Sequence, residues 1–257
     1  VQVPGAGLDR IDVRSLAPGI ALANAYGHDV GIAEYVIGAM LAVTRRFCQV
    51  DADLRRGQWD SVWSGAPVPL WPELAGRTLG ILGYGRIGQA VARRALAFDM
   101  NVMAIRRDAT RPDPLRLPFL RGPEALDEML RRADHLAITL ALTPATRGLI
   151  GARELGLMKP SAVLINVARG EVVDEDALYH ALHEGALAGA ALDVWYRYPA
   201  GAGPTHPGHR PFHTLPNVLM TPHVSGWTDG MMDARAGVIA ENIHRTARGE
   251  APVNLIR

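Results

Sequence analysis

A glycine-rich turn with the spacing G-x-G-x-x-G is the clearest feature that could do chemistry; its residues are Gly83, Tyr84, Gly85, Arg86, Ile87 and Gly88. A strand-like apolar run precedes it, and the helical pattern Arg86–Phe98 follows it. In that context the first glycine permits a tight turn, the second lets the backbone approach a pyrophosphate, and the third lets the helix pack on the strand. The N–H groups at the helix start then face the phosphates. A glycine turn without a ligand is the alternative.

The residues after the next strand indicate which dinucleotide this turn would bind. In an NAD site an acidic residue is expected about 20 residues on, where it binds the ribose hydroxyls. Here Arg106 and Arg107 follow the strand Asn101–Ile105, and Asp108 lies two residues beyond the expected position. An arginine can pair with a 2′-phosphate through two parallel hydrogen bonds. We therefore favour NADP over NAD, with two solvated surface arginines as the alternative.

The elements that must position these residues alternate between strands and helices. Strands are expected at residues 77–82, 101–105, 135–142, 162–167 and 189–194. Helices are expected at residues 33–47, 86–98, 123–132, 151–157, 175–184 and 231–248. This alternation indicates βαβ units and a parallel sheet, and the continuously apolar strands indicate that both faces of the sheet are covered. The expected fold class is α/β.

Composition excludes several classes of protein. Among 257 residues, 27 Lys and Arg balance 26 Asp and Glu, which argues against a nucleic-acid binder that works through a general positive field. The single cysteine, Cys48, permits neither an intramolecular disulfide nor a multi-cysteine zinc site, and favours a reducing, cytoplasmic compartment. The apolar runs are shorter than the roughly 20 residues that cross a bilayer, so no membrane partner is expected.

Several longer segments resemble the D-isomer-specific 2-hydroxyacid dehydrogenase family. The resemblance extends from end to end of the chain and rests on PGAGLDRIDV (4–13), AEYVIGAMLAVTRR (33–46), LAGRTLGILGYGRIGQAVA (74–92), LTPATRGLI (142–150), MKPSAVLINVARGEVVDEDAL (158–178), GAALDVW (189–195) and TPHVSG (221–226).

The resemblance implies a Rossmann-like, doubly wound parallel sheet inserted in a second, smaller flavodoxin-like domain, here incomplete. Residues 26–221 would form the dinucleotide-binding domain, and residues 1–25 and 222–257 the substrate domain. Family members carry further residues ahead of the first segment, so we expect a truncated chain or a remnant of the substrate domain. The family also implies a homodimer, formed through the helix at 33–47 and the arm at 57–76.

The activity that the resemblance implies is hydride transfer between NADP or NAD and C2 of a small 2-hydroxy or 2-oxo acid. Arg169 follows a strand end, where ligands bind in open α/β sheets, and matches the family's substrate arginine. Its planar, permanently charged guanidinium suits a carboxylate. His223 matches the family's acid/base, and imidazole exchanges protons near neutral pH.

Tyr198 stands where the family has a glutamate that assists the histidine. Glutamate would raise the pKa of the imidazole and fix its tautomer, whereas tyrosine can hydrogen-bond the ring without adding charge at neutral pH. We therefore expect a less basic His223 and lower activity at high pH than in a relative that carries glutamate. The formate dehydrogenase branch of the family also lacks this glutamate, so its absence does not imply inactivity.

The resemblance also assigns residues that line the two ligand sites. The cofactor-lining positions, in addition to the glycine turn and the two arginines after it, are Thr143, Val167, Ala168, Asp193 and Gly226; Asp193 matches a position at the nicotinamide end. The substrate positions are Ala6, Gly7, Asn24 and Trp227. Trp227 either points into the cleft and favours a bulky substrate or packs beside the last helix.

Two irregular stretches leave alternatives open. Trp59, Trp63 and Trp71 lie in the arm at 57–76; three large aromatics favour an ordered segment, packed on its own domain or forming a partner surface. The histidines at 206, 209 and 213 suggest a loop over the cleft mouth more than a metal site, because no acid or cysteine is near in sequence. A nucleotide-binding protein with weak or no catalysis is the alternative function.

Overall fold

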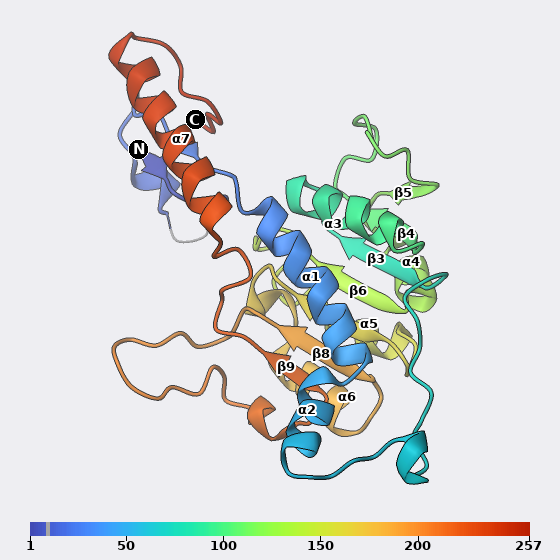
Figure 1. Ribbon diagram of the computed structural model, residues 1–257. Helices are drawn as coiled ribbons and strands as arrows, with labels where there is room; N and C mark the ends of the chain where they lie inside the picture. The colour runs from blue at the N-terminus through green and yellow to red at the C-terminus, as the bar shows by residue number, and fades with distance from the viewer. Residues whose placement is uncertain (9–10) are drawn as a thin grey trace.

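Seven short strands form one parallel sheet in the computed structural model, which describes residues 1–8 and 11–257 (Figure 1). The strands are β3 (Thr78–Leu82), β4 (Asn101–Ile105), β5 (Phe119–Arg121), β6 (His135–Ile138), β7 (Val163–Asn166), β8 (Gly189–Leu192) and β9 (Val218–Met220). Their order across the sheet is β5-β4-β3-β6-β7-β8-β9. The chain therefore builds outward from β3 in one direction and from β6 in the other, as in a doubly wound fold.

Helices cover both faces of this sheet, which is why its central strands are apolar throughout (Figure 1). One face packs against α1 (Asp29–Thr44) and α3 (Arg86–Ala97). The other packs against α4 (Leu126–Arg132), α5 (Ala152–Leu157) and α6 (Glu175–His183). Each face thus has its own hydrophobic core, and both cores hold the strands whose ends reach the candidate site.

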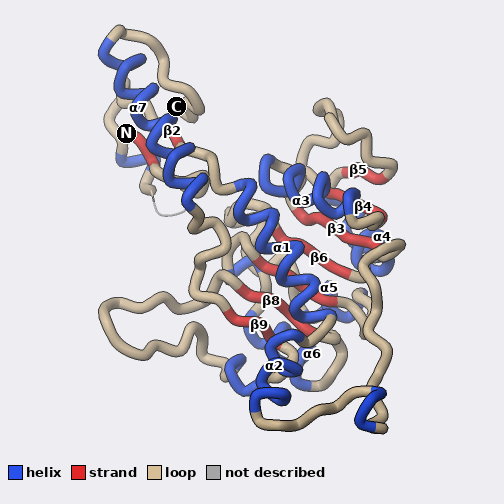
Figure 2. The backbone as a smooth tube through the Cα atoms, viewed as in Figure 1, coloured by secondary structure: helices blue, strands red, loops and turns tan. Residues whose placement is uncertain are grey.

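A smaller lobe lies beside the sheet and holds both chain termini (Figures 1 and 2). It consists of the parallel pair β1 (Gln2–Val3) and β2 (Ala23–Asn24) and the long helix α7 (Asp229–Ala247). The side chain of Asn242, on α7, donates to Gln2 Oε1 at 2.6 Å, which ties the helix to the strand pair. The chain crosses between the lobes twice, once between β2 and α1 and once between β9 and α7 (Figure 1).

Several elements differ from the sequence predictions. The expected helix 33–47 begins earlier, at Asp29, and ends at Thr44; Arg46, in the left-handed region at φ 51°, separates it from a further helix, α2 (Phe47–Arg55). The strand expected at 135–142 ends at Ile138; the next residue, Thr139, donates its hydroxyl to the carbonyl of Gly83 at 2.7 Å. The three-residue strands β5 and β9 were not predicted, since neither contains enough residues to show a period.

The arm at 57–76 runs along the outside of the sheet lobe (Figure 2). Trp59 is 65% and Trp63 91% exposed, which favours the alternative of a partner surface over packing on their own domain. The apolar side chains of Phe47 and Leu54, on the neighbouring helix α2, are exposed as well. Exposed apolar side chains of this size are typical of a partner surface.

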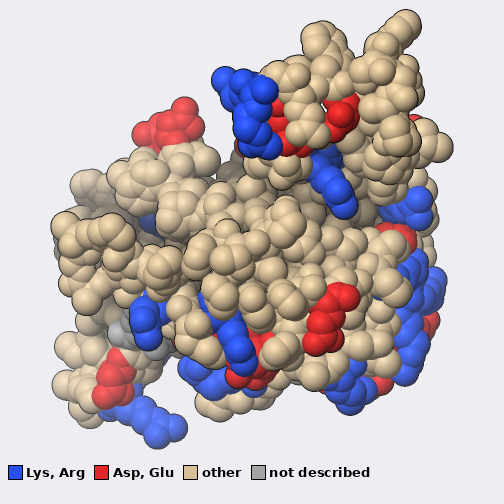
Figure 3. All heavy atoms as spheres, turned by 90° about the horizontal axis from the view of Figure 1, so that it is seen from below, with Lys and Arg blue, Asp and Glu red and all other residues tan. Residues whose placement is uncertain are grey.

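The charged side chains on the face drawn in Figure 3 are not concentrated in a patch of one sign. On the face drawn in Figure 3, basic residues are scattered in small groups, and several lie beside acidic ones. Within the described ranges, no helix combines the length and the apolar character that a membrane span requires.

Candidate active site

The glycine turn joins β3 to α3 at the point where the strand order reverses. Gly83 has φ +109°, and a Cβ there would lie 2.5 Å from the backbone nitrogen of Leu140. A Cβ on Gly88 would overlap the carbonyl oxygen of Gly83, so this glycine lets the helix reach the turn. A Cβ on Gly85, by contrast, would meet no heavy atom within 4 Å. The turn therefore fits a dinucleotide: two glycines pack inward, and the middle one faces open space before the N-terminus of α3.

A cavity of about 1150 Å³ opens beside this turn, lined by residues from both lobes. The residues predicted from the sequence that line it are Ala6, Gly7, Ile87, Thr143, Val167, Ala168, Arg169, Tyr198, His223, Gly226 and Trp227. Other predicted residues lie outside its lining: Asn24, Gly83, Gly85, Arg86, Gly88, Arg106, Arg107 and Asp193.

Arg169 enters this cavity directly after β7. Asn166, buried at the end of the strand, donates its side-chain amide to the carbonyl of Arg169 at 2.9 Å and accepts from Ala168 N at 3.0 Å. The guanidinium of Arg169 donates to the carbonyl of Ala168 at 2.7 Å. A Cβ on Gly170 would lie 2.5 Å from the carbonyl carbon of Trp195, so the chain can turn here only with glycine. The sheet thus determines where the guanidinium lies.

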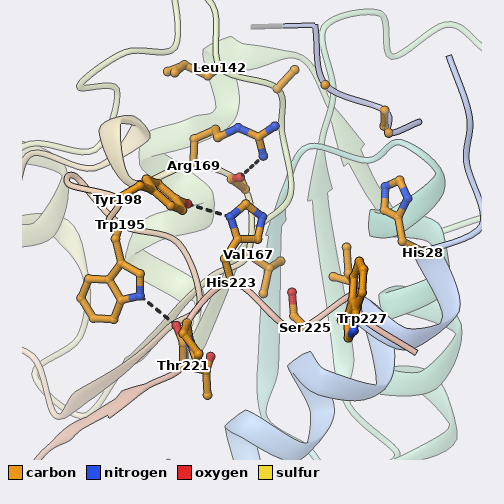
Figure 4. A pocket seen from close by; sticks show the side chains of 18 of the residues that line it. His28, Leu142, Val167, Arg169, Trp195, Tyr198, Thr221, His223, Ser225 and Trp227 are labelled. Atoms are coloured by element: carbon orange, nitrogen blue, oxygen red, sulfur yellow. Dashed lines mark hydrogen bonds between the residues drawn. The ribbon is translucent and has the colours of Figure 1, made fainter. Parts of the chain in front are cut away.

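His223 lies beside Tyr198 and Arg169 in the same part of the cavity (Figure 4). The Tyr198 hydroxyl is 2.7 Å from Nδ1 of His223, as the sequence suggested for a tyrosine in place of the glutamate. His223 has φ +60°, a left-handed conformation that is uncommon outside glycine and must be held by its surroundings.

A buried carboxylate holds the loop that carries His223. Asp193 is fully buried; one oxygen accepts from Thr221 Oγ1 at 2.6 Å and from Val224 N at 2.9 Å, and the other accepts from Ser225 N at 2.9 Å. The resemblance places Asp193 at the nicotinamide end of the cofactor; in the structure its side chain lies outside the cavity lining and holds the loop.

Two aromatic side chains complete this network. The hydroxyl of Tyr35, on α1, lies 2.7 Å from Thr221 Oγ1, and Trp195 Nε1 donates to the carbonyl of Thr221 at 2.8 Å. Because Thr221 gives its proton to Asp193, Tyr35 is the donor in the first pair. Burial raises the pKa of Tyr35 to about 12, so it remains protonated at neutral pH. Sequence reasoning missed Tyr35 and Thr221 in this role, since their signal is a contact between distant segments.

Residues of the smaller lobe form the opposite wall. Asn24 donates to the carbonyl of Ala6 at 3.1 Å, which holds the turn at residues 5–8 against the cavity. The guanidinium of Arg86 lies 4.3 Å from the ring centroid of Tyr26, so this arginine bridges α3 and the crossing segment. Trp227 lines the cavity and is 69% exposed. This favours a side chain that points into the cleft over one packed beside the last helix.

The two arginines after β4 have different surroundings. Arg106 donates to the carbonyls of Arg111 and Pro112 and lies 5.8 Å from the ring centroid of Tyr84, so it closes its own loop. Arg107 is exposed. Asp108 accepts from the backbone and the hydroxyl of Thr110, at 3.1 and 2.6 Å.

The three histidines of the 200–216 stretch do not converge. His206 and His213 stack with centroids 4.6 Å apart, whereas His209 lies 2.7 Å from Glu175 and 2.7 Å from Asp176 at the start of α6. The hydrogen bond to Asp176 raises the pKa of His209. No cluster of three or more His, Cys, Asp or Glu suited to a metal occurs in the described part of the chain. Gly203, Thr205 and Pro207 of this stretch line the cavity.

Comparison with known proteins agrees with this geometry. Residues 37–225 match the family model described as the D-isomer specific 2-hydroxyacid dehydrogenase, NAD binding domain. The chain is 39% identical to D-3-phosphoglycerate dehydrogenase of Methanocaldococcus jannaschii, over 98% of the chain but only 46% of that protein. It is 36% identical to glyoxylate reductase of Thermococcus gammatolerans, over 97% of the chain and 73% of the relative.

Among solved structures, an acyclic imino acid reductase in complex with NADPH and D-Arg superposes with a TM-score of 0.85 and is 29% identical. The match covers 100% of this chain and 78% of the reductase chain.

Proposed function

Because the chain belongs to the D-isomer specific 2-hydroxyacid dehydrogenase family, we propose that it transfers a hydride between NADP or NAD and a small 2-hydroxy or 2-oxo acid. The observation that carries this proposal is the grouping of Arg169, Tyr198 and His223 in one cavity, which also reaches Ile87 at the start of α3. A protein that only bound the nucleotide would not need both a carboxylate-binding arginine and a proton donor there.

Each residue has a distinct role in the proposed reaction. When bound, the reduced nicotinamide supplies the hydride that C2 of the oxo acid receives. Arg169 binds the substrate carboxylate and polarises the neighbouring carbonyl. His223 gives a proton from Nε2 to the carbonyl oxygen, while Tyr198 holds Nδ1 and so orients the ring. In the opposite direction His223 removes the hydroxyl proton.

We propose NADP as the preferred cofactor. Arg107 is exposed beside the strand end at which an NAD site carries an acid, and the nearby Asp108 is engaged by Thr110. The imino acid reductase of the same fold binds NADPH. We expect Arg107→Ala to weaken NADPH binding about tenfold, the effect of one charge-assisted pair, and to leave NADH binding unchanged. Loss of both affinities in equal measure would contradict this role.

The test of the activity is oxidation of NADPH and NADH with a panel of 2-oxo acids that includes glyoxylate, hydroxypyruvate and phenylpyruvate. We expect turnover that Arg169→Ala reduces by at least about 1000-fold while NADPH affinity is retained, because the arginine binds the substrate and stabilises charge on its oxygen. Nucleotide binding with no turnover on any oxo acid would favour the alternative of a binding protein.

We propose further that the protein is a homodimer, joined through the segment expected as a helix at 33–47 and the arm at 57–76. Because most apolar side chains of α1 are buried against the sheet, the exposed end of the first segment is Phe47, where α2 begins. The exposed side chains of Trp59, Trp63, Phe47 and Leu54 support this placement. Light scattering is expected to show twice the monomer mass at micromolar concentration, and Trp63→Ser to lower the dimer fraction. A monomer under these conditions would remove this part of the proposal.

A further inference from the structure

The wall of the cavity that faces the smaller lobe carries two basic side chains that the proposed reaction does not use. His28 precedes α1, and Arg235 lies on α7; both line the cavity that holds Arg169 and His223. Figure 4 shows His28 on the opposite side of this pocket from Arg169 and His223. Arg235 belongs to the smaller lobe, whereas His28 at the start of α1 and Arg169 after β7 belong to the sheet lobe, so a ligand between these side chains would contact both lobes.

The segment before α1 packs closely on α7 and places His28 near Arg235. Gly27 has φ +119°, and a Cβ there would lie 2.6 Å from the Cβ of Ala234 and 3.6 Å from the backbone nitrogen of Arg235. A Cβ on Gly226, in the other crossing, would lie 3.1 Å from the Cβ of His28. The backbone therefore builds this corner of the cavity from segments far apart in sequence.

Both basic side chains have unmet hydrogen-bonding capacity. His28 is only 8% exposed, and its Nδ1 is buried with no hydrogen-bond partner among the described residues. The same is true of Nε of Arg235. Burial and then the charge of Arg235 hold the pKa of His28 below its usual range, with Arg169 adding to the effect and Asp29 opposing it. Burial also lowers the pKa of the Arg235 guanidinium.

The charge of the lining is one-sided. Its ionisable members within the described residues include three arginines and two histidines, and none is Asp or Glu; the five are His28, Arg169, Arg197, His223 and Arg235. A partly buried cation with an unmet donor is costly unless an opposite charge approaches it. An anionic ligand group in the cavity beside His28 and Arg235 would supply that charge.

We propose that the cavity takes a 2-oxo acid with a second anionic group at its far end, which Arg235 and His28 bind while Arg169 holds the carboxylate beside the reacting carbon. This assignment rests on the proposed function and names its substrate class. A carboxylate and a phosphate monoester share the required chemistry. A substrate with a cationic tail would be repelled by the same wall.

Binding of unreactive acids tests the site without relying on turnover. Calorimetry with the NADP⁺-bound protein compares succinate, glutarate and adipate with monocarboxylates of the same chain lengths. We expect the best-fitting dicarboxylate to bind about tenfold tighter than its monocarboxylate, the effect of one charge-assisted pair. Arg235→Met should abolish this difference, and Arg235→Lys should restore most of it. Arg248→Met, which removes an exposed arginine from the end of the same helix, is the matched control and should change nothing.

Kinetics then distinguish the sources of the anion. The pairs are 2-oxoglutarate with 2-oxovalerate, for a carboxylate, and 3-phosphohydroxypyruvate with hydroxypyruvate, for a phosphate. One of these pairs should show the larger preference for the compound with the second anionic group. For that compound we expect Arg235→Met to raise KM about tenfold and to leave kcat little changed. The kinetics of the other compound of the pair should change little.

The inference would be overturned if mono- and dicarboxylates bound with equal affinity. It would also be overturned if Arg235→Met affected both compounds of each pair equally. In either case, turnover of a 2-oxo acid would still support the proposed function. Conversely, dicarboxylate binding that depends on Arg235, with no reduction of any oxo acid, would refute the function and leave the anion site standing.

Discussion

The glycine turn at residues 83–88 and the loop at residues 221–226 serve the same cavity but are held in opposite ways. The turn is held by close backbone packing, which is possible because Gly83 and Gly88 have no side chain. The loop is positioned by added polar contacts, since the buried carboxylate of Asp193 accepts three hydrogen bonds from it. We infer that substitution in the turn acts through steric overlap and affects folding, whereas substitution around the loop acts through geometry and affects the proton transfer.

The largest effect is expected at the turn. Gly83→Ala places a Cβ 2.5 Å from the backbone of Leu140 at φ +109°, and we expect it to lower the free energy of unfolding by about 3 kcal/mol or more. Gly85→Ala is the matched control, because its Cβ meets no protein atom within 4 Å. It should leave stability within about 0.5 kcal/mol and weaken NADPH binding. Denaturant titration and cofactor titration measure the two effects, and equal destabilisation by both variants would break the comparison.

The second prediction concerns Asp193. In Asp193→Asn an NH₂ group replaces one acceptor oxygen and faces a donor of the loop, Ser225 N or the Thr221–Val224 pair. We expect kcat to fall about 100-fold, since small misplacements of a catalytic group have effects of this size. The unmet donor should lower the free energy of unfolding by about 1–3 kcal/mol. Stopped-flow turnover and thermal unfolding check these values; a variant that lost only cofactor affinity would show that the carboxylate does not position the loop.

The third prediction tests the tyrosine that stands in place of the glutamate. Tyr198→Phe removes the 2.7 Å contact to His223 and should lower kcat about tenfold, the effect of one hydrogen bond. Tyr198→Glu adds a negative charge, which favours the protonated imidazole and raises its pKa. Reduction requires that protonated form, so the decline of kcat/KM with rising pH should move to higher pH in Tyr198→Glu. An unchanged pH profile would show that Tyr198 and His223 do not interact during turnover.

The contrast between the turn and the loop also explains which parts of the site could be predicted from the sequence. Motif-bearing residues were identified, because glycine spacing, a strand end before Arg169 and the segment around His223 are local signals. The support of the loop was not, since Tyr35 and Thr221 are 186 positions apart and meet only once α1 lies against the end of the sheet. Likewise the three-residue strand β9 is too short to show a pattern, yet it places the loop beside Asp193. Local motifs therefore predicted which of these residues line the cavity, whereas the contacts that support the loop could be found only from the fold.

The smallest effect is expected at Tyr35, the outermost member of the network. Tyr35→Phe keeps the ring in the core and removes only the hydrogen bond donated to Thr221, so we expect a loss of about 1 kcal/mol and a kcat lowered by no more than about fivefold. Thr221 would still donate to Asp193. Because both residues act through one loop, adding Tyr35→Phe to Asp193→Asn should lower kcat by less than the product of the single effects. Independent effects in this double-mutant cycle would mean that Tyr35 supports the sheet rather than His223.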